Sequence, residues 1–163
     1  MKLPVERLSS SAFAPFGEVI ETRERDWFYI NNGSTQRFHD LAQVTVGDGR
    51  ALISIFRATP LPLPLSVALM EHHPLGSQAF MPLSDRPFLV VVAPSGEYDN
   101  DALRCFLTEP GQGVNYHPGV WHHPVIALEQ ESDFLVVDRG GEGQNCIEVA
   151  IDDTARHIVS LDL

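Results

Sequence analysis

Residues 67–93 read VALMEHHPLGSQAFMPLSDRPFLVVVA and contain three short apolar runs separated by turn residues. The runs occupy residues 67–73, 78–83 and 88–93, and the gaps between them hold Pro, Gly, Ser and Asp. Runs of this length, rich in apolar and β-branched residues and bounded by turn formers, are typical of β-strands. The segment therefore predicts neighbouring strands joined by tight turns.

Similar runs recur along the chain about every 8 to 12 residues, the spacing of an all-β sandwich or barrel. They cover residues 27–30, 43–46, 52–57, 103–107, 125–128, 134–137, 147–151 and 157–161. One short helix is predicted over residues 10–16, with Ser10 or Ser11 as its cap. A parallel βαβ architecture needs crossover helices that this pattern lacks. No repeat or low-complexity linker divides the chain, so we expect one domain over residues 1–163.

The charged residues exclude several functional classes. The chain has 22 acidic and 11 basic residues, a formal net charge of −11, and Lys2 is its only lysine. This composition excludes Schiff-base chemistry by an internal lysine and the phosphate-binding P-loop. The acidic excess argues against nucleic acid and anionic membrane surfaces, which are bound by cationic patches. We therefore expect neither as a partner.

The cysteines and the N-terminal residues indicate a cytoplasmic protein. Cys105 and Cys146 lie far apart without CxxC spacing, which predicts free, buried thiols. The first residues lack the apolar segment of a signal peptide. The longest uncharged apolar stretch, residues 58–70, contains three prolines and is too short to span a bilayer.

Histidines gather in two groups, and the first is His72-His73. Strand alternation over residues 67–73 places Glu71 and His73 on the same face as Val67. If that face is the interior, a carboxylate and an imidazole enter one cavity, and Gln78 adds an amide from the next strand.

The second group lies in residues 116–124, which read YHPGVWHHP. Pro118-Gly119 predicts a turn, and alternation in the strand that follows puts His122 and His123 on opposite faces. Only one of them can then join an interior site. Because buried polar groups need partners and commonly mark a site, we expect the two groups to form one functional centre.

Two motifs in these groups resemble those of the cupin superfamily. Residues 71–78 resemble the first cupin motif, with His73 as its second histidine, Glu71 in place of its first histidine and Gln78 in place of its glutamate. Residues 118–122 resemble the second motif, which ends in a metal-binding histidine, here His122. The chain is more closely similar to the ureidoglycolate lyase family, formerly called ureidoglycolate hydrolase. The matching stretches are residues 12–20, 30–33, 37–42, 73–80, 113–117, 121–124, 133–134 and 138–141.

The resemblance implies a fold, a reaction and an assembly. It implies an all-β, cupin-like antiparallel β-barrel of the jelly-roll type with a few short helical turns. The implied reaction cleaves the C–N bond of (S)-ureidoglycolate to give glyoxylate and urea, in allantoin degradation. It implies nickel as the divalent metal and no organic cofactor. Fold analogy further predicts a homodimer.

The residues suit this reaction, because C–N cleavage requires a base for the hydroxyl proton and an acid for the departing nitrogen. The candidates for these two roles are Glu71, His73, His117 and His122. A divalent ion would be held by His73 and His122, completed by Gln78 or Glu71. A metal-free acid–base site built from the same residues is the alternative.

The substrate carboxylate needs a cationic side chain that can bind both of its oxygens. Because lysine is absent from the interior, this side chain must be an arginine. Arg37, Arg57 and Arg139 are the candidates because they border the family-like stretches. Tyr29, Asn32 and Gln78 can contact the rest of the substrate, although a turn explains Asn32-Gly33 equally well.

Two other functions are open on the sequence alone. One is another metal-dependent cupin enzyme acting on a small carboxylate, and the other is a non-enzymatic module that binds a small ligand.

Overall fold

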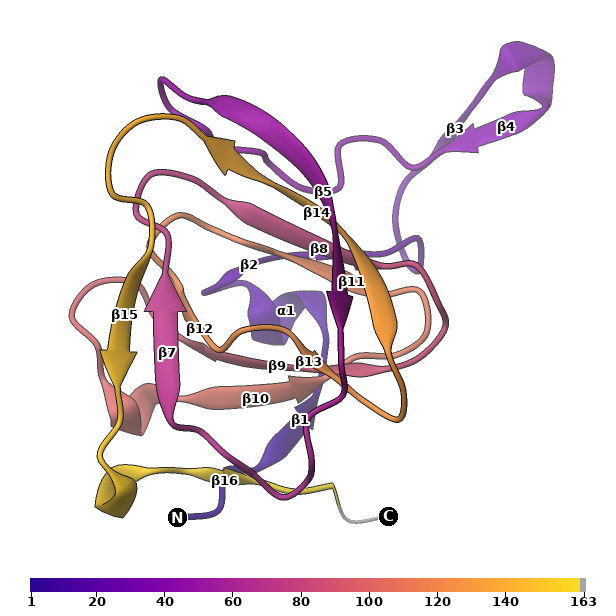
Figure 1. The fold of residues 1–163 in the computed structure, drawn as a ribbon. Coiled ribbons are helices and arrows are strands. Elements are labelled where there is room, and N and C mark those ends of the chain that lie inside the picture. The colour runs from indigo at the N-terminus through magenta and orange to yellow at the C-terminus, as the bar shows by residue number, and fades with distance from the viewer. Residues whose placement is uncertain (162–163) are drawn as a thin grey trace.

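The computed structural model describes residues 1–161 as two facing β-sheets with short helical turns at their edges (Figure 1). The elements are β1 (Val5–Arg7), α1 (Ser10–Phe13), β2 (Gly17–Ile20), β3 (Phe28–Ile30), η1 (Asn31–Gly33), β4 (Thr35–Arg37), β5 (Arg50–Ala58), β6 (Leu65–Ser66), β7 (Leu69–His72), β8 (Gln78–Pro82), β9 (Phe88–Ala93), η2 (Asn100–Ala102), β10 (Arg104–Leu107), β11 (Gly113–Tyr116), β12 (Trp121–His122), β13 (Ile126–Ala127), β14 (Ser132–Gly140), β15 (Ile147–Ala150), η3 (Asp153–Ala155) and β16 (Ile158–Val159).

The larger sheet has the order β1-β10-β9-β12-β7-β15, with β13 also on β9, and the smaller has the order β2-β11-β8-β14-β5. Pairing within these sheets is antiparallel except that β1 runs parallel to β10. This parallel pair needs no crossover helix because almost a hundred residues, including β2, β5, β7, β8 and β9 of the two sheets, lie between its two members. The predicted all-β, cupin-like fold with short helical turns is confirmed.

Strand β9 shows how the core is divided. Phe88, Val90 and Val92 belong to an inner cluster between the two sheets. The alternate residues Leu89 and Val91 belong to an outer cluster that β6 and β16 help to cover. All six β9 side chains are therefore buried, which explains why the run 88–93 is apolar throughout rather than alternating.

The predicted helix is shorter in the structure. It covers Ser10–Phe13, and its cap is Ser9, whose hydroxyl accepts from the Ala12 amide at 3.3 Å, rather than Ser10 or Ser11. No helix in residues 1–161 has the length and apolarity needed to cross a membrane.

Two strand predictions are wrong in detail. Residues 43–46 form no strand, because the Thr45 amide bonds to the Ser77 hydroxyl at 2.8 Å instead of to a backbone ladder. The run 67–73 does not alternate from its start. Strand β7 begins at Leu69, and Val67 packs with Met70 in the outer cluster, so Val67 does not share a face with Glu71.

Strands β3 and β4 form a hairpin that projects from the body of the molecule (Figure 1), and these two strands pair only with each other. The hairpin turn is η1, in which Asn32 and Gly33 both have positive φ. The turn explanation for Asn32-Gly33 is thus confirmed. Trp27, Phe28 and Tyr29 at the start of this hairpin are 42%, 48% and 61% exposed.

Candidate functional site

Strands β7 and β12 bring the two histidine groups together on the inner face of the larger sheet. Glu71 is the register partner of His122, so their side chains project from the same face. The His122 Nε2 atom lies 3.6 Å from Glu71 Oε1, and the His73 Nε2 atom lies 3.9 Å from the same oxygen. Glu71, His73 and His122 each offer one ligand atom within 4.8 Å of the others. We call these three residues the EHH cluster.

Both imidazoles of the EHH cluster are held with a lone pair directed inward. The His73 Nδ1 atom donates to the Asn145 carbonyl at 2.6 Å, and the His122 Nδ1 atom donates to the Val120 carbonyl at 3.0 Å. A carbonyl oxygen only accepts, so each Nδ1 carries a proton, and whenever the ring is neutral its Nε2 atom is left with the lone pair. This is the arrangement of metal-ligating histidines, whose other ring nitrogen is fixed by a carbonyl or a carboxylate.

The surroundings of the EHH cluster shift the pKa values of Glu71 and His122. The nearby His122 ring lowers the pKa of the Glu71 carboxyl, so Glu71 is ionised near neutral pH. Burial lowers the pKa of His122, which stacks on Tyr116 with ring centroids 4.3 Å apart. The cluster therefore offers one carboxylate and two imidazoles to a ligand.

Gln78 adds a fourth group on the same inner face. It is the register partner of Tyr116, which stacks on His122, and its amide nitrogen donates to Asp138 at 3.1 Å. Its oxygen is buried and has no hydrogen-bond partner within residues 1–161, and the same is true of the Nε2 atoms of His73 and His122. Buried polar atoms are rarely left unsatisfied unless a ligand or ion completes them. Two imidazoles, a carboxylate and an amide oxygen fit a divalent transition metal.

His122 and His123 have different hydrogen-bond surroundings. His122 faces the inner cluster, whereas the ring of His123 bonds to the Pro124 carbonyl at 2.8 Å. His72 likewise points away from the EHH cluster, since its ring packs on Trp121 of the outer cluster with centroids 4.1 Å apart. One histidine of each adjacent pair therefore belongs to the site.

The structure does not bring His117 into the EHH cluster. It follows Tyr116 at the end of β11, and its Nε2 atom bonds to the Glu18 carboxylate at 2.9 Å. Tyr116 occupies the inward position, so the next residue points to the other face of the sheet. Its predicted catalytic role stays a prediction.

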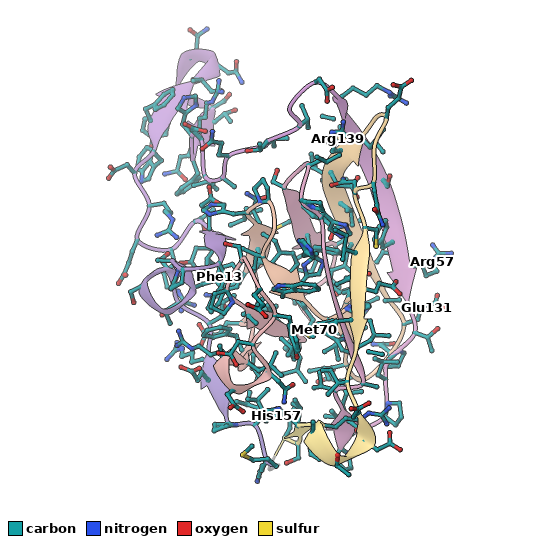
Figure 2. All side chains as sticks on the ribbon, turned by 90° about the vertical axis from the view of Figure 1, so that its left-hand side faces the viewer. Phe13, Arg57, Met70, Glu131, Arg139 and His157 are labelled. Carbon is teal, nitrogen blue, oxygen red and sulfur yellow. The ribbon has the colours of Figure 1, made fainter. Side chains whose placement is uncertain are left out.

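Two of the three predicted arginines are engaged away from the EHH cluster. Arg57 forms a paired contact with Asp133, at 2.9 and 3.1 Å, and it lies beside Glu131 (Figure 2). Arg139 is 8% exposed and bonds to the Val46 and Glu142 carbonyls. Both side chains project from the outer face of the smaller sheet, in alternation with the inward residues of β14. Their substrate contacts stay predictions.

Three further predicted residues lie on the projecting hairpin. Tyr29 is in β3, Asn32 is in the turn and Arg37 ends β4. None of them contacts the EHH cluster of the same chain within the described residues. A substrate contact by these residues therefore stays a prediction as well.

Two residues beside Glu71, Cys146 and Glu148, were not predicted as part of a site. Both lie with Glu71 in a second group of ligand atoms within 4.8 Å, and the Cys146 thiol donates to Glu71 Oε2 at 3.7 Å. Cys146 is a free thiol, as predicted, but it is exposed rather than buried because it precedes the edge strand β15. Only the pairing of β15 with β7 reveals this proximity, so the sequence carried no local signal for it.

Comparison with known proteins identifies the family of the chain. The family model described as ureidoglycolate lyase matches residues 1–158. A protein named ureidoglycolate lyase from Pseudomonas syringae pv. syringae is 59% identical over 150 residues, which is 90% of this chain and 88% of the relative. Its namesake from Pseudomonas fluorescens is 55% identical over 161 residues, 97% of this chain and 96% of the relative. A third of the same name, from Burkholderia mallei, is 57% identical over 148 residues, 90% and 87% of the two chains. Because the family model matches residues 1–158, a range that includes Glu71, His73 and His122, the chain belongs to the ureidoglycolate lyase family.

Proposed function

We propose that this chain cleaves (S)-ureidoglycolate into glyoxylate and urea at the EHH cluster. The observation that carries the proposal is the pair of inward lone pairs on His73 and His122 beside the ionised Glu71, in a chain related along its whole length to proteins named ureidoglycolate lyase. The substrate class comes from those relatives, and the site supplies the chemistry that the reaction needs.

The reaction is an elimination that moves one proton within the substrate. The substrate carbon bears a hydroxyl, a hydrogen, a carboxylate and a ureido nitrogen. When the C–N bond breaks, its electron pair leaves with the nitrogen, the hydroxyl oxygen loses its proton and forms the aldehyde of glyoxylate, and the nitrogen gains a proton to give urea. No water, nucleophile or redox partner is consumed, so one proton carrier in the right place is sufficient.

Glu71 is suited to carry that proton. Its Oε1 atom faces the two histidines, whereas its Oε2 atom faces the Cys146 thiol. The carboxylate is ionised near neutral pH and can accept the hydroxyl proton through Oε2 and return it to the departing nitrogen. The same group thus acts first as base and then as acid.

We further propose that His73 and His122 hold a divalent ion with the Gln78 oxygen as a third ligand, which leaves Glu71 free to carry the proton. When bound, the ion supplies Lewis acidity that lowers the pKa of the substrate hydroxyl. Imidazole ligands favour nickel, zinc, iron or copper over magnesium and calcium, and nickel is our first candidate. The protein's part is to keep both histidines in one tautomer through Asn145 and Val120.

A product assay tests the proposed function. The purified chain is given racemic ureidoglycolate, and glyoxylate, urea and ammonia are followed together. We expect glyoxylate and urea in equal amounts, from one enantiomer, faster than the spontaneous reaction. Ammonia in place of urea would indicate an amidohydrolase instead. A rate of glyoxylate release no faster than the spontaneous reaction would contradict the proposed function. Stoichiometric iron with oxygen uptake would favour another cupin enzyme, and tight binding without turnover would favour a ligand-binding module.

We also propose that the chain forms a homodimer through the outer face of the smaller sheet. The edge strand β5 exposes Ile53 and Ile55, at 76% and 61%, on this face. Open edges and exposed apolar faces favour association with a second copy. Light scattering should give twice the chain mass, and Ile53→Asp should shift the equilibrium to monomer. A stable wild-type monomer at micromolar concentration would contradict this prediction.

A further inference from the structure

The EHH cluster leaves one requirement of the proposed reaction unmet, because its own charged side chain is the anionic Glu71 and the substrate is also an anion. Glu148 lies next to Glu71, and Asp138 accepts a hydrogen bond from Gln78, so both add acidic groups. A substrate carboxylate in such surroundings needs a cation of the protein to hold and orient it, and a guanidinium does so through two parallel hydrogen bonds.

We infer that Arg50 holds the carboxylate of the substrate, an inference that rests on the proposed function. Arg50 is the first residue of β5 and is exposed. Within residues 1–161 it makes no ion pair and no side-chain hydrogen bond, and no part of its guanidinium is committed elsewhere.

Eight of the ten arginines are already engaged. They bond to carboxylates, hydroxyls or carbonyls of the described chain: Arg7, Arg23, Arg25, Arg57, Arg86, Arg104, Arg139 and Arg156. Recruiting one of these would break an existing contact. Arg50 and Arg37 are the two that can bind an anion without such a loss among the described residues.

The strand register places Arg50 on the face that carries the site. Phe56 of β5 contacts Phe80 of the inner cluster, so Phe56 faces inward. Because side chains alternate along a strand, every second residue of β5 counted from Phe56 also faces inward. Leu52 fills the space beside Gly140, as expected for the same face. Arg50 is two residues before Leu52 and is paired with Gly140, so it continues this inward row at the end of the strand.

The same register relates Arg50 to Gln78. Asp138 bonds to Gln78 and is the register partner of Leu52. Arg50 therefore lies two strands away from Gln78 and two residues before Leu52 along β5. The usual strand spacings put the Cα atoms of Arg50 and Gln78 about 12 Å apart. One arginine side chain and a small substrate together span such a distance.

The surroundings of Arg50 leave room for an anion. Arg50 lines a hollow of about 340 Å³ with Asp48, Gly49, Gly140, Gly141 and Glu142, three of which are glycines. The Arg139 guanidinium donates to the carbonyls of Val46 and Glu142, which lie on the two chain segments that border this hollow. These bonds hold the segment that leads into β5 in place. Arg50 is thus a free cation on an anchored strand end.

Arg37 is the competing candidate, and its position disfavours it. It ends β4 on the projecting hairpin (Figure 1), whose strands pair only with each other. A contact between Arg37 and the substrate would require the hairpin of a second copy. Arg50 needs no other chain.

The test uses the full chain with its native metal and two probes. Glycolate carries the substrate's carboxylate and hydroxyl, and glycolamide replaces the carboxylate with a neutral amide. We expect Arg50→Gln to weaken glycolate binding by about 10- to 100-fold, the loss of a charge-assisted hydrogen-bonded pair, and to leave glycolamide binding within about twofold. Arg50→Lys should lose less glycolate affinity, because lysine keeps the positive charge but cannot form the two parallel hydrogen bonds of a guanidinium. KM for ureidoglycolate should rise by a factor similar to the glycolate loss.

Arg7→Gln is the matched control, since Arg7 is 71% exposed in an ion pair with Glu109 and its replacement removes the same charge. It should change neither probe. The inference is overturned if Arg50→Gln binds glycolate as the wild type does, if it weakens both probes equally, or if Arg37→Gln shows the selective loss instead. A wild-type chain that releases no urea would remove the proposed function, whereas the glycolate and glycolamide comparison would still decide the role of Arg50.

Discussion

Replacing His73 with alanine should lower kcat/KM for ureidoglycolate by more than about 100-fold, because removing even an outer partner of a metal ligand costs 10- to 100-fold. His73 presents its Nε2 lone pair to Glu71 and His122. Its loss removes one imidazole from the EHH cluster and would leave the proposed ion with an incomplete set of ligands. Steady-state kinetics with the metal content of each preparation measures the effect.

His72→Ala provides the control at the adjacent position. His72 packs on Trp121 away from the EHH cluster, so its replacement should reduce stability more than activity. Unfolding curves for both variants separate the two effects. Equal losses of kcat/KM in His72→Ala and His73→Ala would contradict the assignment of the inner face as the site.

Replacing Arg139 with leucine should destabilise the fold by about 2–4 kcal/mol, because it removes charge-assisted bonds to two carbonyls and leaves these acceptors without their partner. Arg139 is 8% exposed and joins Val46 to Glu142. Gly49 and Gly76 both approach this side chain so closely that a Cβ on either would collide with it. Urea denaturation measures the change.

Arg57→Leu is the control for Arg139. Arg57 lies on the same outer face of the smaller sheet as Arg139, but its ion pair with Asp133 is solvent-exposed. Exposed ion pairs contribute little to the free energy of unfolding. A loss of stability in Arg57→Leu as large as that in Arg139→Leu would contradict the structural role of Arg139.

The strand pattern and the histidine pairs were predictable from the sequence, and the physical reasons are local. The run 88–93 is apolar at every position, and β9 has those bounds. His122 and His123 had to face opposite sides of any strand, and the turn at Pro118-Gly119 marked where that strand starts. Strands β2 and β11 were missed because Gly17, Gly113 and Asn115 give them a weak strand pattern.

Long-range pairing decided what the sequence could not show. Arg139 and Arg57 look alike as isolated arginines, and only the fold buries one and exposes the other. Cys146 reaches Glu71 through the pairing of β15 with β7, and Arg50 lies on the inner face through the pairing of β5 with β14. Such neighbours are set by register across the sheets, which local patterns do not specify.

The most direct measurement is a titration of metal-free chain with nickel while urea release from ureidoglycolate is recorded. Elemental analysis first verifies that chelation has removed all metal, and the His73→Ala variant is titrated beside the wild type. We expect wild-type activity to rise from the spontaneous rate to a plateau at one ion per chain, and the variant to stay near the spontaneous rate. Full wild-type activity in the verified metal-free chain would contradict the metal site, and equal activity of the two chains would contradict the EHH cluster as the place of catalysis.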